Sequence, residues 1–448
     1  MEDYRPHFRV AHHNVSDKAR TYLAGLVMKA PRKNMERMEE YVEGCDYQAQ
    51  QQFISDSPWD HVAVDEHLAR DVSNLLGGKG STLVIDESGF SKKGVMSAGV
   101  ARQWNGRQGK VDNCQVGVFA ALTDGVHSAL VDKRLYLPEG WTADPERCSK
   151  ARIPESQQEY RSKTSLAWEM IESAVARDVS FGWVAMDALY GSAPWLLFAI
   201  DDIGKRFVAD VRGNQHVYAE DPMPYLPRRK HAKGRKFTKL RSRSSSVQID
   251  QLFDTEDTRK WRRINVREST KGSVEVWASR KRVWMWDGKE KQPRCFWAVC
   301  TIDVHSGDTK WFLSNAPAST SMRELLTQHA HRFWIERAFQ DAKTSLGMAD
   351  YQARGWTAWH HHMTMVMLAM LFMVQERKLH QREVELLTYT DIIEMLGTFL
   401  PRADVTPEDV YRNIVRRHRK RKAAIDSARR AKERRERRQI KLKDVLTK

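Results

Sequence analysis

The chain has 448 residues and carries 74 Lys and Arg against 58 Asp and Glu, a formal net charge of +16. A single hydrophobic core rarely serves more than about 300 residues, so this length disfavours one domain and predicts two or three. The positive charge favours a polyanionic partner, with nucleic acid ahead of an anionic membrane surface.

Cysteine content and hydropathy disfavour further classes of protein. The five cysteines include no CxxC pair of the kind that holds zinc, and they favour a reducing, cytoplasmic protein. The N-terminal stretch MEDYRPHFRV lacks the apolar core of a secretory signal. The most apolar run, 363–374, is shorter than the roughly twenty residues of a membrane-spanning helix, so it predicts a buried helix and no membrane partner.

The first half of the chain changes from helical to strand-like patterning near residue 80. Up to residue 78, apolar residues recur at helical spacing and predict a small helical domain. Leu83-Val84-Ile85 is then a short apolar run ending at Asp86, as in a buried strand that leads into a loop. The next predicted elements are strands over 116–122 and 127–137 joined by an Asp-Gly turn, a helix over 156–178, a strand over 181–186, a helix near 193–202 and a strand over 206–211. This βββαβαβ order implies an α/β fold, a mixed sheet flanked by helices.

The second half begins with alternating apolar residues, which predict a β-rich insertion with a basic, Ser-rich loop at 228–246. Helical patterning returns over 322–345, about 357–379, 391–397 and from 407. We therefore divide the chain into a helical domain (1–78), a core in two parts (79–211 and 319–380), the insertion (212–318) and a basic helical C-terminal region (381–448).

Two acidic residues end predicted strands. Asp86 and Asp187 both follow apolar runs, and side chains at strand ends can share one crevice of a sheet. Two such carboxylates could hold a divalent metal ion. The alternative is that each acid belongs to a turn or caps a helix.

A third acid lies on a predicted helix between two cations. Arg332, Glu336 and Lys343 fall within roughly 40° of one another, whereas Asp341 should face away. A solvated face with an Arg–Glu pair is the alternative. Three carboxylates and two cations suit DNA cutting, because metal held by the acids can activate a water or a 3′ hydroxyl while the cations contact phosphate oxygens.

With these residues the sequence resembles the bacterial insertion-sequence transposases of the DDE superfamily, in the group that carries a Tyr-x2-Arg-x3-Glu-x6-Lys motif. Arg332, Glu336 and Lys343 match at the required spacing, and His329 stands where Tyr is usual. The similarity also covers the stretches 84–94, 112–119, 135–141 and 185–191.

The resemblance implies an RNase H-like fold with a β-rich insertion between the second Asp and the Glu. It implies that Asp86, Asp187 and Glu336 are the catalytic, metal-binding residues and that they hold Mg²⁺, as two ions per site, with Mn²⁺ able to substitute. The partners implied are transposon terminal inverted repeats, target DNA and a second copy of the chain in a homodimer. A bacterial, nucleoid-associated protein fits these partners.

Other residues carry weaker signals. Lys92 and Lys93 could touch DNA or could be solvated, and His329 could donate to a phosphate. Related transposases stack a flipped base on an aromatic of the insertion, whose tryptophans are otherwise core residues. These tryptophans are Trp261, Trp277, Trp284, Trp286, Trp297 and Trp311. Residues 360–362 are consecutive histidines, which diverge round a helix and favour structural roles over one metal site.

The C-terminal stretch 416–443 has fifteen Lys or Arg against three acids, which predicts a helix that orders on DNA or else a flexible basic tail. The sequence thus predicts a transposase that cleaves its element's ends and joins their 3′ hydroxyls to target DNA. Two rivals remain: an RNase H-like nuclease without strand transfer, and a non-catalytic DNA-binding regulator.

Overall fold

The computed structural model describes residues 1–10, 13–106, 108–227, 237–269, 272–290, 292–401, 403 and 405–446. The predicted loop at 228–246 therefore lies partly outside the described residues. None of the helices in the described part of the chain is long and apolar enough to cross a membrane. All five cysteines are free, and four of them are buried.

The N-terminal region is helical, as predicted. After a 3-10 helix (Glu2–Phe8) and two short strands, β1 (Arg9–Val10) and β2 (His13–Asn14), come α1 (Ser16–Val27), α2 (Met35–Tyr41), α3 (Tyr47–Ser55) and α4 (His61–Leu76). Asn34, Asp46 and Asp60 begin α2, α3 and α4, and each side chain accepts a hydrogen bond from a backbone N–H of the first turn. Such caps satisfy donors that a helix start leaves unpaired.

The centre of the molecule is a ten-stranded mixed sheet. Its strands in the first half of the chain are β3 (Gly78–Ser91), β4 (Ala101–Asn105), β5 (Lys110–Thr123), β6 (Ser128–Leu135), β7 (Phe181–Met186) and β8 (Arg206–Val211). The strand order runs β11-β12-β13-β14-β8-β7-β3-β5-β4, with β6 paired to β5. β3, β7 and β8 are parallel and the other pairs are antiparallel. This is the predicted RNase H-like α/β fold.

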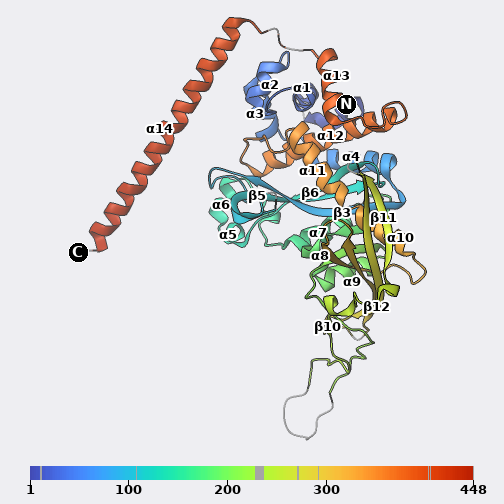
Figure 1. Ribbon diagram of the computed structural model, residues 1–448. Helices are drawn as coiled ribbons and strands as arrows, with labels where there is room; N and C mark the ends of the chain where they lie inside the picture. Colours follow the sequence, from blue (N-terminus) through green and yellow to red (C-terminus); the bar gives the residue numbers. More distant parts are fainter. Residues whose placement is uncertain are drawn as a thin grey trace.

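Helices cover both faces of the sheet. The connecting helices are α5 (Glu139–Thr142), α6 (Pro145–Lys150), α7 (Lys163–Ala176), α8 (Ala188–Gly191) and α9 (Pro194–Asp202). α7 packs on β5, and α8 and α9 pack on β8. Figure 1 draws α7, α8 and α9 below β5 and β6, and the N-terminal helices, α11 and α12 above these strands.

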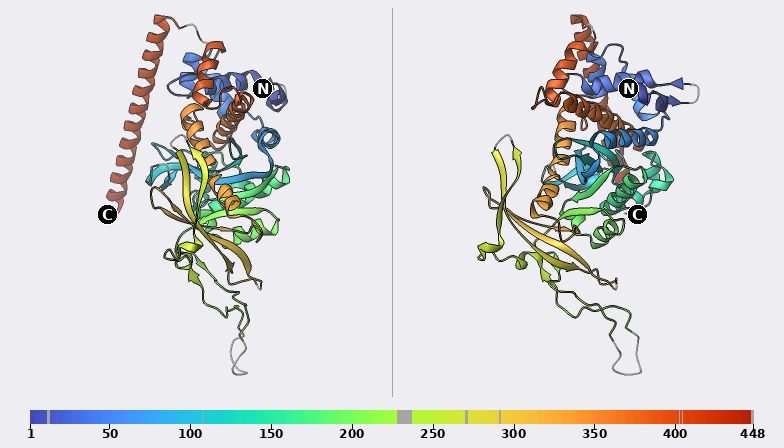
Figure 2. Two further views of the ribbon diagram at one scale, coloured as in Figure 1. Left: turned by 45° about the vertical axis from the view of Figure 1, so that its right-hand side comes forward. Right: turned by 90° about the vertical axis from the view of Figure 1, so that its right-hand side faces the viewer.

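The insertion continues the same sheet. Beyond two short strands, β9 (His216–Val217) and β10 (Val247–Gln248), it contains β11 (Arg262–Ser269), β12 (Gly272–Met285), β13 (Arg294–Asp303) and β14 (Thr309–Ser314). β14 pairs with β8, so the insertion strands hydrogen-bond to the core. Figure 2 shows these strands in yellow and olive below the blue N-terminal helices, with the yellow pair, β11 and β12, rising toward them.

The last third of the chain is helical: α10 (Met322–Ala330), α11 (Phe333–Ser345), α12 (Trp356–His380), α13 (Tyr389–Phe399) and α14 (Pro407–Leu446). The apolar run 363–374 lies in α12 and is almost entirely buried, as predicted. α12 contacts β6 and the N-terminal helices α1, α3 and α4. Most of α14 stands clear of the rest of the molecule (Figure 1).

The three consecutive histidines of α12 point to different partners. His361 lies between the carbonyl oxygens of Ile54 and Trp59, at 3.0 and 3.1 Å. His362 shares a 2.8 Å hydrogen bond with the Tyr22 hydroxyl. His360 is buried against other aromatic rings. These contacts tie the N-terminal helices to the core and give the histidines structural roles.

Three predicted elements differ from the structure. The helix predicted over 156–178 begins only at Lys163, where the Ser162 side chain caps it, and it ends at Ala176. β3 does not end at Asp86 but continues to Ser91, because it pairs with β5 along that whole length. The helix predicted over 322–345 is two helices that break at His331 and Arg332. β4, α5 and α6 were not predicted, since they are short and two of them lie in stretches of polar residues.

Candidate active site

The sheet places Asp86 and Asp187 beside each other. The parallel pairing of β3 with β7 runs up to Ile85 opposite Met186, and the next residue on each strand is the acid. Asp187 lies just beyond the carboxyl end of β7, whereas Asp86 remains in β3 opposite Phe119 of β5. Adjacent strand ends form the crevice where α/β sheets bind ligands.

Asp187 also caps a helix. One of its carboxylate oxygens accepts a 2.9 Å hydrogen bond from the backbone N–H of Leu189 in α8. Gly191 ends α8, and a Cβ there would lie 2.0 Å from the carbonyl oxygen of Asp210 in β8. Only glycine therefore allows α8 to lie this close to the sheet. The capping role and a metal-binding role are compatible, because the cap uses one oxygen of the carboxylate.

The charge of Asp187 makes ionisation of Asp86 less favourable. Burial is the largest influence on Asp86 and the charge of Asp187 the next, and together they raise the pKa of Asp86 to about 7. Arg332 and the backbone N–H of Glu87 act in the opposite direction but are outweighed. Two carboxylates that meet in a partly buried crevice favour a cation between them. Their oxygen donors fit the hard-ion preference of Mg²⁺.

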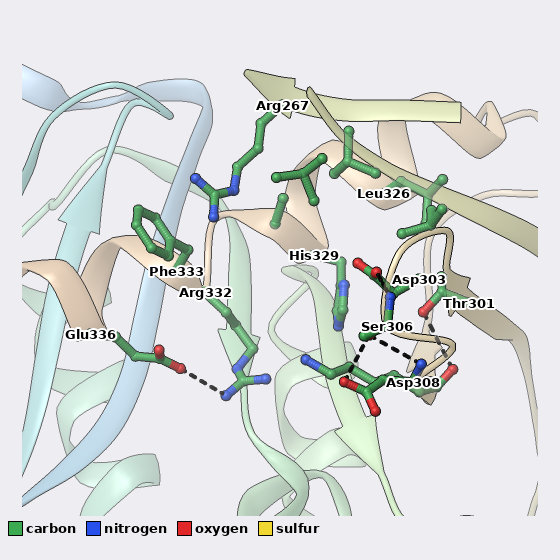
Figure 3. A pocket seen from close by; sticks show the side chains of 15 residues that line it. Arg267, Thr301, Asp303, Ser306, Asp308, Leu326, His329, Arg332, Phe333 and Glu336 are labelled. Carbon is green, nitrogen blue, oxygen red and sulfur yellow. Dashed lines mark hydrogen bonds and ion pairs between the residues drawn. The ribbon is translucent and has the colours of Figure 1, made fainter. Parts of the chain in front are cut away.

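Glu336 lines the same cavity from α11. The cavity is about 570 Å³ and is lined by Asp86, Glu87, Ser88, Gly89, Trp104, Gly106, Asp187, Glu336, Phe339, Gln340, Lys343 and Thr344. The Glu336 side chain is 61% exposed, and its carboxylate lies 3.8 Å from the Arg332 guanidinium. A dashed line marks this contact in Figure 3. Among the described residues, no group of three His, Cys, Asp or Glu side chains is close enough to hold a metal ion. In the position described, Glu336 therefore does not form one ligand set with the two aspartates.

Arg332 is held by a carboxylate that the sequence did not single out. Its guanidinium donates to Asp210 of β8, and His329 lies 2.5 Å from the other oxygen of the same carboxylate. The His329 ring also stacks on Phe312 of β14, with centroids 4.2 Å apart. Burial alone would lower the pKa of Arg332, but the surrounding carboxylates, led by Asp210, raise it. Asp210 thus anchors the start of α11, the helix that carries Glu336.

A second contact fixes the break between α10 and α11. Thr82 of β3 donates a 2.6 Å hydrogen bond to Gln328, and its hydroxyl lies 2.7 Å from Nδ1 of His331. All three side chains are buried. Burial also lowers the pKa of His331 to about 4, so the ring is neutral at neutral pH. The break is therefore tied to β3, the strand that carries Asp86.

The predicted cations lie at two places. Lys343 lines the acidic cavity and donates a 3.4 Å hydrogen bond to the Gly89 carbonyl. Lys92 and Lys93 line a separate cavity of about 710 Å³, together with Arg32 and Arg354. The Lys92 ammonium lies 3.4 Å from the centroid of the Tyr351 ring.

Two other acids near the site have cationic partners. Glu87 lies 2.7 Å from Lys163, although it also lines the cavity. Asp341 is 3.1 Å from Arg337 and does not line the cavity. Neither arrangement resembles that of the Asp86 and Asp187 pair.

Tyr190 is a further residue near the acids. Its ring is fully buried, and within the described residues its hydroxyl has no hydrogen-bond partner. Burial, then the charges of Glu87 and Asp86, raise its pKa well above the usual value. Tyr190 comes three residues after Asp187, in the stretch 185–191, and this position could have indicated from sequence that it lies near the acids.

A mixed sheet with paired aspartates and a glutamate helix beside them defines a nuclease-type site. A family model described as a DDE superfamily endonuclease matches residues 4–273, more than half of the chain, so the chain belongs to that family. A curated relative, the probable transposase for insertion sequence element IS701 of Microchaete diplosiphon, is 24% identical over 330 residues, covering 73% of this chain and 74% of the relative. The predicted family is confirmed. Asp86 and Asp187 lie inside the matched range, whereas Glu336 lies beyond it.

Proposed function

We propose that the chain is a transposase that cleaves the ends of its element and joins the 3′ hydroxyls to target DNA. The observation that carries the proposal is the register of β3 and β7, which sets Asp86 beside Asp187 in the cavity that Glu336 also lines. Membership of the DDE endonuclease family and similarity to a probable transposase support it.

In this proposal Asp86, Asp187 and Glu336 hold Mg²⁺, as two ions per site. Bound there, the ions would activate a water or a 3′ hydroxyl and stabilise the leaving oxygen of a phosphodiester. Asp187 is held by its cap on α8, and Arg332 by Asp210, so both keep fixed positions. Turning Glu336 toward the aspartates frees Arg332 of its 3.8 Å contact and lets the guanidinium face a phosphate.

Covalent joining of the 3′ hydroxyl to target DNA distinguishes a transposase from a nuclease with the same fold. The test uses duplexes that carry the inverted repeats flanking the protein's own gene, pre-cut to expose a 3′ hydroxyl, with a plasmid target and Mg²⁺. We expect plasmid molecules covalently joined to the labelled end. Hydrolysis of DNA without any joined product would favour the nuclease, and no reaction at all would favour a non-catalytic regulator.

Two copies of the chain are proposed to pair the two ends of the element. Large apolar side chains are exposed around α12 and α13, with Leu379 at 73%, Leu386 at 78% and Phe399 at 79%. Exposed large apolar side chains are candidates for protein–protein contacts. These residues are our candidates for the contact between copies.

We expect a phosphate contact made by Lys92 to give DNA affinity a dependence on pH. Burial lowers the pKa of Lys92 to about 7, so the ammonium is charged below pH 7 and neutral above it. If Lys92 binds phosphate, DNA affinity should fall as pH rises from 6 to 8. We expect Lys92→Arg, which stays charged, to remove part of this fall in a fluorescence-anisotropy titration. Lys93→Arg at the exposed neighbour is the control, and equal pH profiles for all three proteins would contradict a Lys92 phosphate contact.

The basic helix α14 should add non-specific DNA affinity. Its first turns are tied to α2 through Arg416 with Glu39 and Lys420 with Glu36, at 2.5 and 2.9 Å. The described residues beyond Lys422 are exposed along the free part of the helix. A chain that ends at Lys422 keeps the anchoring contacts and loses ten Lys or Arg.

We expect this truncated chain to bind DNA more weakly and with a smaller slope of log K against log salt. Each phosphate contact contributes about 0.9 to that slope, so the difference counts the contacts that are lost. Thermal unfolding should be unchanged, because the removed segment has few contacts with the body. An unchanged salt slope would show that α14 does not lie on DNA.

A further inference from the structure

An exposed tryptophan lies at the edge of the acidic cavity. Trp104 of β4 is 54% exposed, and it lines the cavity together with Asp86, Asp187 and Glu336. Val111 lies opposite it on β5 and is 52% exposed. Together Trp104 and Val111 place exposed apolar surface directly beside the charged groups of the cavity, where a ligand with both apolar and charged parts could bind.

The hairpin that carries Trp104 is firmly attached to β3. The neighbouring Asn105 is 1% exposed and donates a 3.2 Å hydrogen bond to the Ser91 hydroxyl. Gly89 makes room for it, since a Cβ there would lie 2.5 Å from the Asn105 side-chain oxygen. Gln108 also donates to Ser91, at 3.0 Å. Trp104 of β4 is therefore presented from a backbone that is fixed to β3, the strand that holds Asp86. A fixed backbone keeps the entropic cost of binding low.

The tryptophans of the insertion have different surroundings from Trp104. Trp261 and Trp297 are each 9% exposed, and Arg280 lies 4.1 Å from the centroid of the Trp297 ring. Trp286 donates its indole N–H to the Glu290 carbonyl. Trp277 is 41% exposed, but it lies on β12 and does not line the acidic cavity. Of the six insertion tryptophans, each a candidate for either core packing or base stacking, Trp277 is the one among the exposed large apolar residues of the described chain, so it serves as the comparison.

We propose that Trp104 is a binding site for an unpaired nucleobase of the DNA strand whose phosphate lies at the carboxylates. The inference rests on the proposed function. Aromatic side chains that hold single-stranded DNA stack on base faces regardless of sequence, while cations and metal sites hold the backbone. Here Lys343 and the three acids line the part of the cavity where the phosphate would bind, and Trp104 supplies a flat apolar surface in the same cavity. Phe339 adds a second apolar surface to it.

The base could come from the element's end or from target DNA, and two probes separate these sources. One probe is a duplex whose 3′ hydroxyl faces an unpaired overhang with 2-aminopurine at the first unpaired position. The other is a continuous duplex with 2-aminopurine in a central mismatch. A blunt, fully paired duplex is the reference. Binding is measured with the full chain in Ca²⁺ in place of Mg²⁺, so that the carboxylates keep a divalent ion, and gel analysis of each probe checks that no strand is cut.

We expect 2-aminopurine fluorescence to be quenched on one of the two probes. Trp104→Ala should weaken binding of that probe by about 5- to 100-fold and leave the blunt duplex unchanged, because stacking is lost and backbone contacts remain. Trp104→Phe should retain most of the affinity. Trp277→Ala is the matched variant at the other exposed tryptophan, and it should behave like the unaltered protein.

Several results would overturn the proposal. One is equal affinity of Trp104→Ala and the unaltered protein for all probes. Another is a loss of affinity in Trp104→Ala that is the same for unpaired and blunt probes. A third is a loss of affinity in Trp277→Ala and none in Trp104→Ala. If Trp104→Ala unfolds, absent quenching with the unaltered chain still contradicts the site. Quenching without any DNA cutting in Mg²⁺ would refute the proposed function and leave the stacking site standing.

Discussion

Asp187→Asn is expected to abolish DNA cleavage, with a loss on the order of 10³-fold or more, while DNA binding stays intact. The substitution removes a negative charge from the pair that Asp86 and Asp187 form, and metal catalysis supplies several kcal/mol that depend on that charge. Asparagine can still cap α8, because its side-chain oxygen accepts the Leu189 N–H in the same way. Cleavage and binding are measured on the same end duplex in Mg²⁺.

Asp178→Asn is the matched control for this prediction. Asp178 is an exposed acid shortly before β7, and its φ of 55° suits asparagine as well as aspartate. The control should cleave at the rate of the unaltered protein. Cleavage by Asp187→Asn at that same rate, or a parallel loss of binding and cleavage, would contradict a catalytic role for Asp187.

Asp210→Ala is expected to lower the free energy of unfolding by about 3 kcal/mol and to slow cleavage strongly. The side chains of Asp210 and Arg332 are 13% and 19% exposed, so the substitution leaves a largely buried guanidinium without its main partner. It also removes the partner of His329 and loosens the start of α11. Urea denaturation and the cleavage rate measure the two effects.

A double substitution separates anchoring from catalysis. Asp210→Ala with Arg332→Leu should recover part of the lost stability, because no unpaired charge remains, but it should not recover cleavage. Asp308→Ala, at an exposed acid near β14, should change stability by less than about 0.5 kcal/mol. Stability of the single variant close to that of the unaltered protein would show that Asp210 does not hold α11.

The sequence predicted the parts of the fold that depend on local patterning. The apolar run before Asp86, the Asp-Gly hairpin and the strand before Asp187 are present where expected. The sequence also predicted that the two acids lie close together, because each follows the apolar part of a strand. That Asp86 and Asp187 are direct neighbours depends on the register between β3 and β7, and this register cannot be read from the sequence of either strand alone.

Other features depend on contacts between distant segments. The break between α10 and α11 interrupts a sequence with continuous helical spacing, and it is stabilised by Thr82, about 250 residues earlier. Asp210 follows an ordinary strand pattern and acquires its role only through Arg332 and His329. Trp104 lies on a short edge strand, so its place beside the acids follows from the pairing of β4 with β5.

The most direct test of the account locates the metal ion on the chain itself. Fe²⁺ takes the place of Mg²⁺, and peroxide then generates hydroxyl radicals that cut the polypeptide close to the bound ion. We expect cuts near Asp86, Asp187 and Glu336 that excess Mg²⁺ suppresses and that are absent in Asp187→Asn. Cuts at other positions, or an unchanged pattern in Asp187→Asn, would contradict the assignment of these three carboxylates to the metal.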